Sequence, residues 1–155
     1  MFTISDTKLN KIDLENQVSD DKAGAIVTFD GRVRNHNEGK PVDSLEYQAY
    51  ESMAQKVGLE IIEKAIKKFD IHKVIGSHRV GHLQIGDAAI IIAVSSSHRA
   101  EAFAACQYII DEIKSLVPIW KKEHYTNEDS EWVACHNCVS HSHESTHDHS
   151  HSHSH

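Results

Sequence analysis

The chain has 155 residues, of which 39% are hydrophobic and 25% charged, and it carries a formal net charge of −7 at pH 7. This composition is typical of one soluble domain, and the acidic charge argues against nonspecific nucleic-acid binding, which needs a broad cationic surface. No apolar run approaches the roughly 20 residues of a membrane span, and the N-terminus has no signal-peptide pattern. The chain has three cysteines, an odd number that argues against a disulfide framework, so we expect a cytoplasmic protein.

The first predicted elements are a short strand and a weak helix. Residues 2–5 (FTIS) favour a strand. Residues 6–18 favour an amphipathic helix with Leu9, Ile12 and Val18 on one side.

Two strands are predicted around a polar loop. Residues 23–34 are rich in β-formers, and Gly31 within them indicates a bulge or a close backbone approach. Residues 35–43 are polar and predict a loop, whereas residues 44–50 alternate with the period of two of a half-buried strand. We expect the two strands to pair as an antiparallel hairpin.

The next segment predicts a long amphipathic helix over residues 52–70. Its apolar stripe begins with Val57, Ile61 and Ala65, and its lysines face outward. Ser52 suits the N-cap position.

The remaining body predicts a buried strand followed by a second long helix. Residues 72–80 and 87–97 favour strands, the latter apolar enough to be central and buried on both faces. A helix over residues 100–116 follows, and Pro118 ends it. Its inward positions are Ala102, Cys106, Ile109 or Ile110, and Ile113. Short strands are then predicted at residues 119–125 and 131–135.

These elements indicate an α+β class, with a mixed or antiparallel sheet packed against two long helices. The composition changes at Cys135, and half of the fourteen histidines lie between His141 and His155. A segment with so few apolar residues cannot offset the entropy of ordering. We therefore expect one domain over residues 1–134 and a disordered Cys/His-rich tail over residues 135–155.

The tail has the chemistry of weak transition-metal ligands, because thiolate and imidazole bind zinc, copper and nickel. The candidate ligands are Cys135, Cys138, His141, His143, His147 and His149. A loosely bound metal reservoir and an inert hydrophilic tail are both compatible with this composition, and we expect no metal site in the body.

Basic side chains cluster at the ends of the predicted elements, at Arg34, Arg79, His98, Arg99, Lys114 and Lys121. If these ends converge, they form a cationic pocket in an acidic protein. Arginine suits phosphate and carboxylate, and a helix N-terminus adds N–H donors for an anion. A lysine with cationic neighbours and apolar walls can act as acid, base or nucleophile.

Each of these residues also has a structural interpretation. Lys114 in a last helical turn meets the helix dipole favourably, His98 can cap a loop, and Lys122 can be a solvated partner of Glu123. The residues alone therefore predict an anion-binding α+β domain. Two other classes stay open: a noncatalytic module that holds a pterin or nucleotide phosphate, and a metal-handling protein whose function lies in the tail.

Five blocks occur in an order that identifies a family. They are G-x-V-R at 31–34, L-E-Y-x-A-Y at 45–50, H-R-x-G-x-L-x-I-G at 78–86, S-x-H-R-x-E-A-F at 96–103 and P-I-W-K-K-E at 118–123. Together, over Gly24 to Trp132, the sequence resembles the catalytic, large subunit of molybdopterin synthase.

The resemblance implies an α/β hammerhead fold and a homodimer at the centre of a heterotetramer. Each end would carry a small ubiquitin-like sulfur-carrier subunit. The implied substrate is cyclic pyranopterin monophosphate, which receives two sulfurs from the carrier's C-terminal thiocarboxylate and becomes molybdopterin. The resemblance implies that the reaction requires no cofactor.

The resemblance also implies roles for individual residues. Lys114 and Lys121 match two essential lysines, which would position the thiocarboxylate and transfer protons or stabilise the acyl-sulfur intermediate. Arg34, His98 and Arg99 would hold the pterin phosphate. The family often has a further cationic residue just beyond the tryptophan that reaches the neighbouring subunit; here His136 is the candidate to replace it, with a pH-dependent charge.

Overall fold

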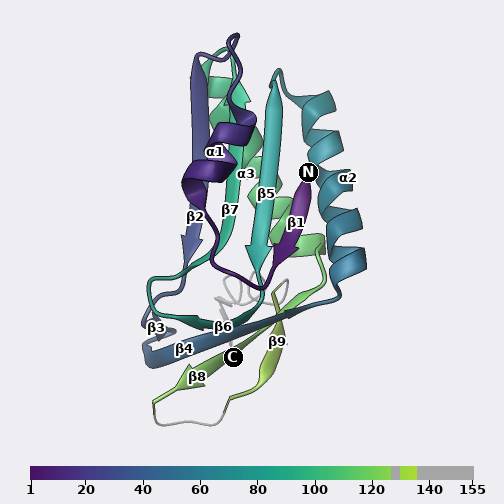
Figure 1. Ribbon diagram of the computed structural model, residues 1–155. Coiled ribbons are helices and arrows are strands. Elements are labelled where there is room, and N and C mark those ends of the chain that lie inside the picture. Colours follow the sequence, from purple (N-terminus) through teal and green to yellow (C-terminus); the bar gives the residue numbers. More distant parts are fainter. Residues whose placement is uncertain (127–129, 136–155) are drawn as a thin grey trace, which may run out of the picture.

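The computed structural model describes residues 1–126 and 130–135, and in these the chain forms two β-sheets and three helices (Figure 1). The helices are α1 (Lys11–Val18), α2 (Glu51–Lys68) and α3 (Arg99–Leu116). The strands are β1 (Phe2–Ser5), β2 (Ala25–Arg32), β3 (His36–Asn37), β4 (Lys40–Ala49), β5 (Lys73–Arg79), β6 (Gly81–Gln84), β7 (Ala88–Ser96), β8 (Ile119–Tyr125) and β9 (Trp132–Ala134). The predicted α+β class with two long helices is confirmed.

The first sheet has the strand order β1-β5-β7-β2 and forms the upper layer in Figure 1. Helix α1 lies on one of its faces, and α2 and α3 cover the other. Strand β7 is central and is buried along almost its whole length, as its continuous apolar run predicts. The core of the molecule therefore lies between this sheet and the two long helices.

The second sheet lies across the lower end of the first. Strand β4 is its longest, and it pairs with β3, β6 and β8, while β9 extends β8 at the edge. Strand β2 leads into this layer at Val33, which is buried, and α3 leads into it at Val117. The C-terminal end of α3 therefore points at the second sheet.

The sequence explains why α3 ends there. Its predicted inward residues are all buried, including both Ile109 and Ile110. Pro118 cannot continue the helix, so Val117 takes an extended conformation and the chain enters β8 at once. Lys114 is thus fixed in the last turn of α3, beside the sheet that carries Lys121.

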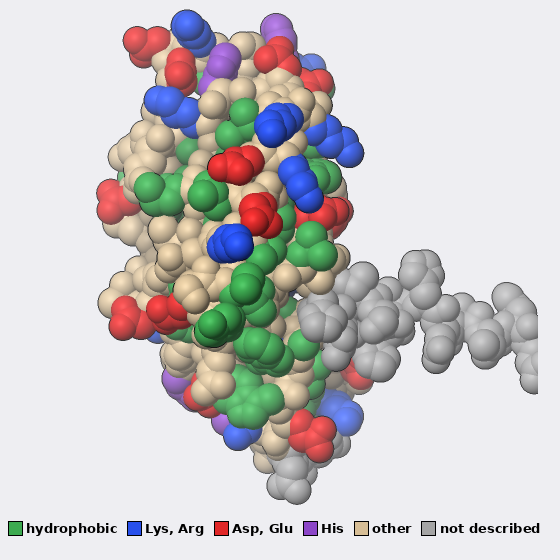
Figure 2. All heavy atoms as spheres, turned by 90° about the vertical axis from the view of Figure 1, so that its right-hand side faces the viewer, with side chains coloured by type: hydrophobic (Ala, Val, Ile, Leu, Met, Phe, Trp, Pro, Cys, Tyr) green, Lys and Arg blue, Asp and Glu red, His purple; other side chains and the backbone are tan. Residues whose placement is uncertain are grey.

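The outer surface of α2 mixes both signs of charge with scattered apolar groups. In Figure 2 basic and acidic side chains gather on the upper part of this face, and hydrophobic ones run toward the junction of the two layers. Met53, Leu59 and Ile66 on α2 are more than one-third exposed. No helix in the described part of the chain is long and apolar enough to cross a membrane.

The predicted hairpin between residues 23–34 and 44–50 is wrong. Strand β2 pairs with β7, whereas β4 pairs with β6 and β8 in the other sheet. The stretch expected to be a loop instead forms the β3–β4 hairpin, whose turn has Glu38 at φ 52° and Gly39 at φ 77°. The two strands are close in sequence, but each finds its partners farther along the chain, where pairing buries more apolar surface.

Smaller differences concern the helix starts and strand β6 (Gly81–Gln84), which the sequence analysis does not predict. Ile12 is 69% exposed, and Leu14 is buried in its place, because α1 begins after an Asn10 cap whose side chain accepts from the Asp13 amide. Ser52 lies inside α2, and Tyr50 takes the cap position. The bulge indicated by Gly31 is confirmed as a register shift between β2 and β7.

Candidate functional site

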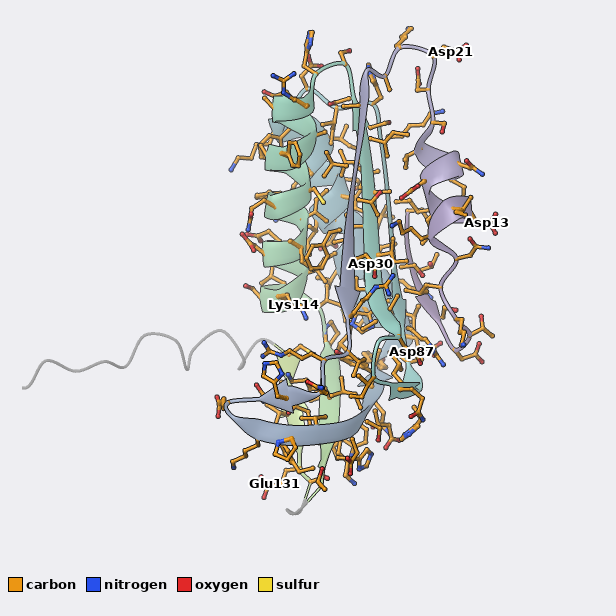
Figure 3. The ribbon with its side chains drawn as sticks, turned by 90° about the vertical axis from the view of Figure 1, so that its left-hand side faces the viewer. Asp13, Asp21, Asp30, Asp87, Lys114 and Glu131 are labelled. Atoms are coloured by element: carbon orange, nitrogen blue, oxygen red, sulfur yellow. The ribbon has the colours of Figure 1, made fainter. Side chains whose placement is uncertain are left out.

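A cavity of about 230 Å³ opens at the junction of the two sheets. Five elements (β2, β3, β4, α3 and β8) and the segment after β2 contribute to its lining, which consists of Arg32, Val33, Arg34, His36, Asn37, Val42, Leu45, Tyr47, Lys114, Lys121 and Glu123. Figure 3 shows Lys114 at the lower end of α3, facing the second sheet. The structure thus brings together three of the predicted site residues: Arg34, Lys114 and Lys121.

A buried carboxylate organises one wall of this pocket. Glu123 is 8% exposed, and its Oε1 lies 2.8 Å from Nζ of Lys121. The Asn37 amide donates to both oxygens of Glu123, at 3.2 and 2.9 Å, and the Tyr125 hydroxyl donates to Oε2 at 2.6 Å. Lys121 is therefore held in a fixed position by a fully bonded partner.

The same contacts set the ionisation of two groups. Burial by itself raises the pKa of Glu123, but hydrogen bonds from Lys121 and Tyr125, together with the charge of Lys121, outweigh it and lower the pKa. The hydrogen bond to Glu123 is the main reason that the pKa of Tyr125 is raised. Glu123 is therefore an anion at neutral pH.

The other cations of the pocket differ in their partners. Arg32 pairs with Asp30 at 2.9 Å, and Arg34 makes a 3.4 Å hydrogen bond to the Asn37 side chain. Within residues 1–126 and 130–135, Lys114 forms no hydrogen bond or ion pair. Arg34 and Lys114 thus leave most of their donors for an anionic ligand.

His98 and Arg99 do not reach this pocket within one chain. They stand at the start of α3, and an 18-residue helix separates them from its other end by about 27 Å. Arg79 does not line the pocket either, because it pairs with Asp87 at 3.1 Å. One chain therefore assembles only part of the predicted cationic set.

The sequence interpretation missed Glu123, Asn37 and Tyr47 as pocket residues. It paired Glu123 with Lys122, but the ion pair is to Lys121, and Lys122 lies over the Trp132 ring at 5.8 Å. The period of two in a strand places residues two apart on the same face, and this signal could have identified the Lys121–Glu123 pair.

His136 and all of the proposed tail ligands except Cys135 lie outside the described residues. Cys135, the first residue of the expected tail, packs into the core at 6% exposure. In the described part of the chain, no group of three or more His, Cys, Asp or Glu side chains is arranged to hold a metal ion.

Comparison with known proteins gives a consistent result. The family model described as MoaE protein matches residues 4–116. The molybdopterin synthase catalytic subunit of Nostoc sp. is 42% identical over 138 residues, which is 88% of this chain and 84% of the relative. The one from Thermoplasma volcanium is 43% identical over 129 residues, or 83% and 94%. The crystal structure of molybdopterin synthase from Staphylococcus aureus has a TM-score of 0.81 and 38% identity, and the match covers 85% of this chain and 96% of that one.

The buried ion pair predicts a pH-dependent contribution to stability. The pKa of Glu123 is lower in the folded chain than its ordinary value, so its contribution is present above about pH 4.5 and is lost as pH falls through the folded-state value. At pH 7, Glu123→Gln should lower the free energy of unfolding by about 1–3 kcal/mol. In urea unfolding, the difference from the parent chain should stay constant from pH 7 to about pH 4.5 and should shrink as the pH falls further toward pH 3.5. Glu60→Gln on the exposed face of α2 is the control, and a gap independent of pH would contradict the assignment.

Proposed function

We propose that the chain, which belongs to the MoaE protein family, is the catalytic subunit of a molybdopterin synthase. It transfers sulfur from the C-terminal thiocarboxylate of a small ubiquitin-like carrier subunit to cyclic pyranopterin monophosphate, which yields the dithiolene of molybdopterin. The observation that carries the proposal is the convergence on one pocket of Lys114 from α3, Lys121 from β8 and Arg34 from the segment after β2. The reaction takes place in the cytoplasm and requires no cofactor.

The charges of the pocket suit a reaction between two anions. The pterin brings a phosphate, and the carrier brings a thiocarboxylate, so like charges must be held close together. Cations in a partly dry site offset this repulsion far better than water does. Arg34 supplies the planar fork that suits phosphate, and the two lysines face the acyl end of the carrier.

A second copy of the chain supplies the missing phosphate contacts in this proposal. The outer face of α3 exposes Phe103 at 61% and Leu116 at 52%. Arg99 and Lys114 lie eight and seven residues on either side of Gln107, or about 12 and about 10 Å along the helix axis. A twofold axis near Gln107 therefore brings Arg99 of one copy level with Lys114 of the other.

The same axis accounts for the open side of the first sheet. Strand β2 is an edge strand, and its Phe29 is 37% exposed on the face that packs against α3. An antiparallel contact between two α3 helices therefore also covers Phe29. A homodimer with His98 and Arg99 acting in trans, and with one carrier subunit at each end, follows from this arrangement.

The proposed reaction is tested by mixing the full chain with a thiocarboxylated carrier and cyclic pyranopterin monophosphate, and measuring molybdopterin formation. Lys114→Ala and Lys121→Ala should each lower turnover by ~10²–10³, because each removes a charge that stabilises the transition state. Circular dichroism should show an unchanged fold. A chain that binds the pterin but forms no product would instead be a binding module.

Mixed dimers test the sharing of the site. Lys114→Ala and Arg99→Ala chains, carrying different affinity tags, are co-expressed, and the heterodimer is isolated. If Arg99 acts in trans, one site carries both substitutions and the other carries neither, so about half of the parent turnover returns. If both residues serve the same chain, each site carries one substitution and the heterodimer stays inactive.

The tail is proposed to bind transition-metal ions through its imidazoles, independently of catalysis. Because Cys135 is buried, it is set apart from the other candidate ligands. Deleting residues 140–155 should remove most binding of Zn²⁺ or Ni²⁺ in calorimetry while sulfur transfer stays near the parent rate. Binding to the full chain should fade below about pH 6 as the imidazoles take up protons near their ordinary value of ~6.5. Lost turnover in the truncated chain would place the tail in the working structure.

A further inference from the structure

The two lysines of the pocket have different surroundings. Lys121 is 2.8 Å from the buried Glu123 carboxylate, which stabilises its positive charge. Lys114 has no such carboxylate among residues 1–126 and 130–135. This contrast separates two groups that the sequence treats alike.

A second, smaller cavity lies behind Lys114. Its volume of about 10 Å³ is room for roughly one water molecule. Lys114, His78 and Cys135 line it, and the rest of its wall is aliphatic. Any water there has few polar partners apart from the Lys114 ammonium and the His78 ring.

His78 is held in a single orientation and tautomer. It lies in β5 at 3% exposure, and its Nδ1 is 2.8 Å from the carbonyl oxygen of Arg79. A carbonyl only accepts, so Nδ1 carries the hydrogen and Nε2 presents a lone pair. The Tyr47 ring packs edge-on to the imidazole, with centroids 4.8 Å apart.

The imidazole is uncharged under working conditions. Burial is the main cause that lowers the pKa of His78, to about 4, and the hydrogen bond to Arg79 only partly opposes it. At neutral pH the ring is therefore an acceptor beside Lys114, not a competing cation.

We propose that His78 is a positioning residue for Lys114: its Nε2, through one water in the small cavity, accepts a hydrogen bond from the Lys114 ammonium. We infer further that Lys114, not Lys121, is the lysine that exchanges a proton during sulfur transfer. The inference rests on the proposed function and divides the work between its two lysines.

The proton balance favours this division. When Lys114 acts as an acid, its N–H bond breaks and the electron pair stays on Nζ. The proton goes to the oxygen that is released as the cyclic phosphate of the pterin opens, where an O–H bond forms. The neutral amine still has N–H groups to donate to the water, which donates in turn to Nε2, so the chain of hydrogen bonds survives. Loss of a proton from Lys121 would instead leave the Glu123 carboxylate without its counter-charge, which is costly in a buried site.

Two substitutions at His78 separate its contacts. In His78→Asn the amide nitrogen lies near the Nδ1 position and keeps the bond to Arg79, but no acceptor replaces Nε2. In His78→Gln the amide reaches the Nε2 position. With the full chain, thiocarboxylated carrier and cyclic pterin, His78→Asn should lower kcat about tenfold with KM for the pterin within about twofold, and His78→Gln should recover most of the loss.

The pH profile gives a readout that a purely structural role would not move. A hydrogen bond to the ammonium is stronger than one to the amine, so losing the acceptor favours the amine. In the plot of kcat against pH, the fall in kcat on the alkaline side (the alkaline limb) should therefore move to lower pH by about half to one unit in His78→Asn. Val117→Ile, which adds a methyl group to the same cavity and displaces the water, should move the limb the same way and covers the case in which His78→Asn does not fold.

Competitive acetylation of the chain alone, read by mass spectrometry of the Lys114 and Lys121 peptides, needs no enzyme activity. The pH dependence of Lys114 labelling should shift in His78→Asn and that of Lys121 in Glu123→Gln. Unchanged Lys114 labelling and an unmoved kcat limb in both His78→Asn and Val117→Ile would overturn the inference. If the parent chain transferred no sulfur, the proposed function would fail, while the labelling would still decide whether His78 contacts Lys114.

Discussion

The turn at Val117 and Pro118 is the constraint on which the site depends. It ends α3 and starts β8 with no intervening loop, so Lys114 and Lys121 face one pocket from two different elements. The helix end is fixed by the packing of Ile109, Ile110 and Ile113 against the first sheet. The strand is fixed by its pairing with β4. The spacing of the two ammonium groups is therefore set by the core of the whole domain and not by a flexible loop.

A carboxylate in an anion-binding pocket is consistent with this rigidity. Arg34, Lys114 and Lys121 converge there, and without a ligand their charges repel one another. Glu123 offsets part of that repulsion, and its bonds to Asn37 and Tyr125 satisfy its oxygens, so the buried charge is tolerated. Because the carboxylate pairs with Lys121 and not with Lys114, it lowers the repulsion among the cations and also gives the two lysines different surroundings.

The sequence predicted those parts of the fold that depend on local pattern. The apolar stripe of α3 and the apolar run of β7 are buried whichever elements they pack against, so these two assignments do not depend on the topology. Strand partners depend on chain segments far away, which is why the expected pairing of β2 with β4 failed and β6 was missed. The family resemblance pointed to Lys114 and Lys121, and the period of two in a strand could have given the Lys121–Glu123 pair. The predicted helix over residues 100–116 already separates His98 and Arg99 from Lys114 by a helix length.

The two layers contribute differently to stability and to the pocket. The first sheet and its helices hold most of the buried aliphatic side chains, whereas the second sheet supplies β3, β4 and β8 to the pocket. His78 and Tyr47 connect the layers, since His78 belongs to a core strand and Tyr47 to a pocket strand, and their rings are in contact. If His78 positions Lys114 as proposed, a substitution at this contact changes the surroundings of Lys114 without removing any charge from the pocket. Such a change alters proton transfer before it alters ligand binding, because binding depends on the total charge of the pocket while proton transfer depends on the hydrogen-bond partner of a single nitrogen.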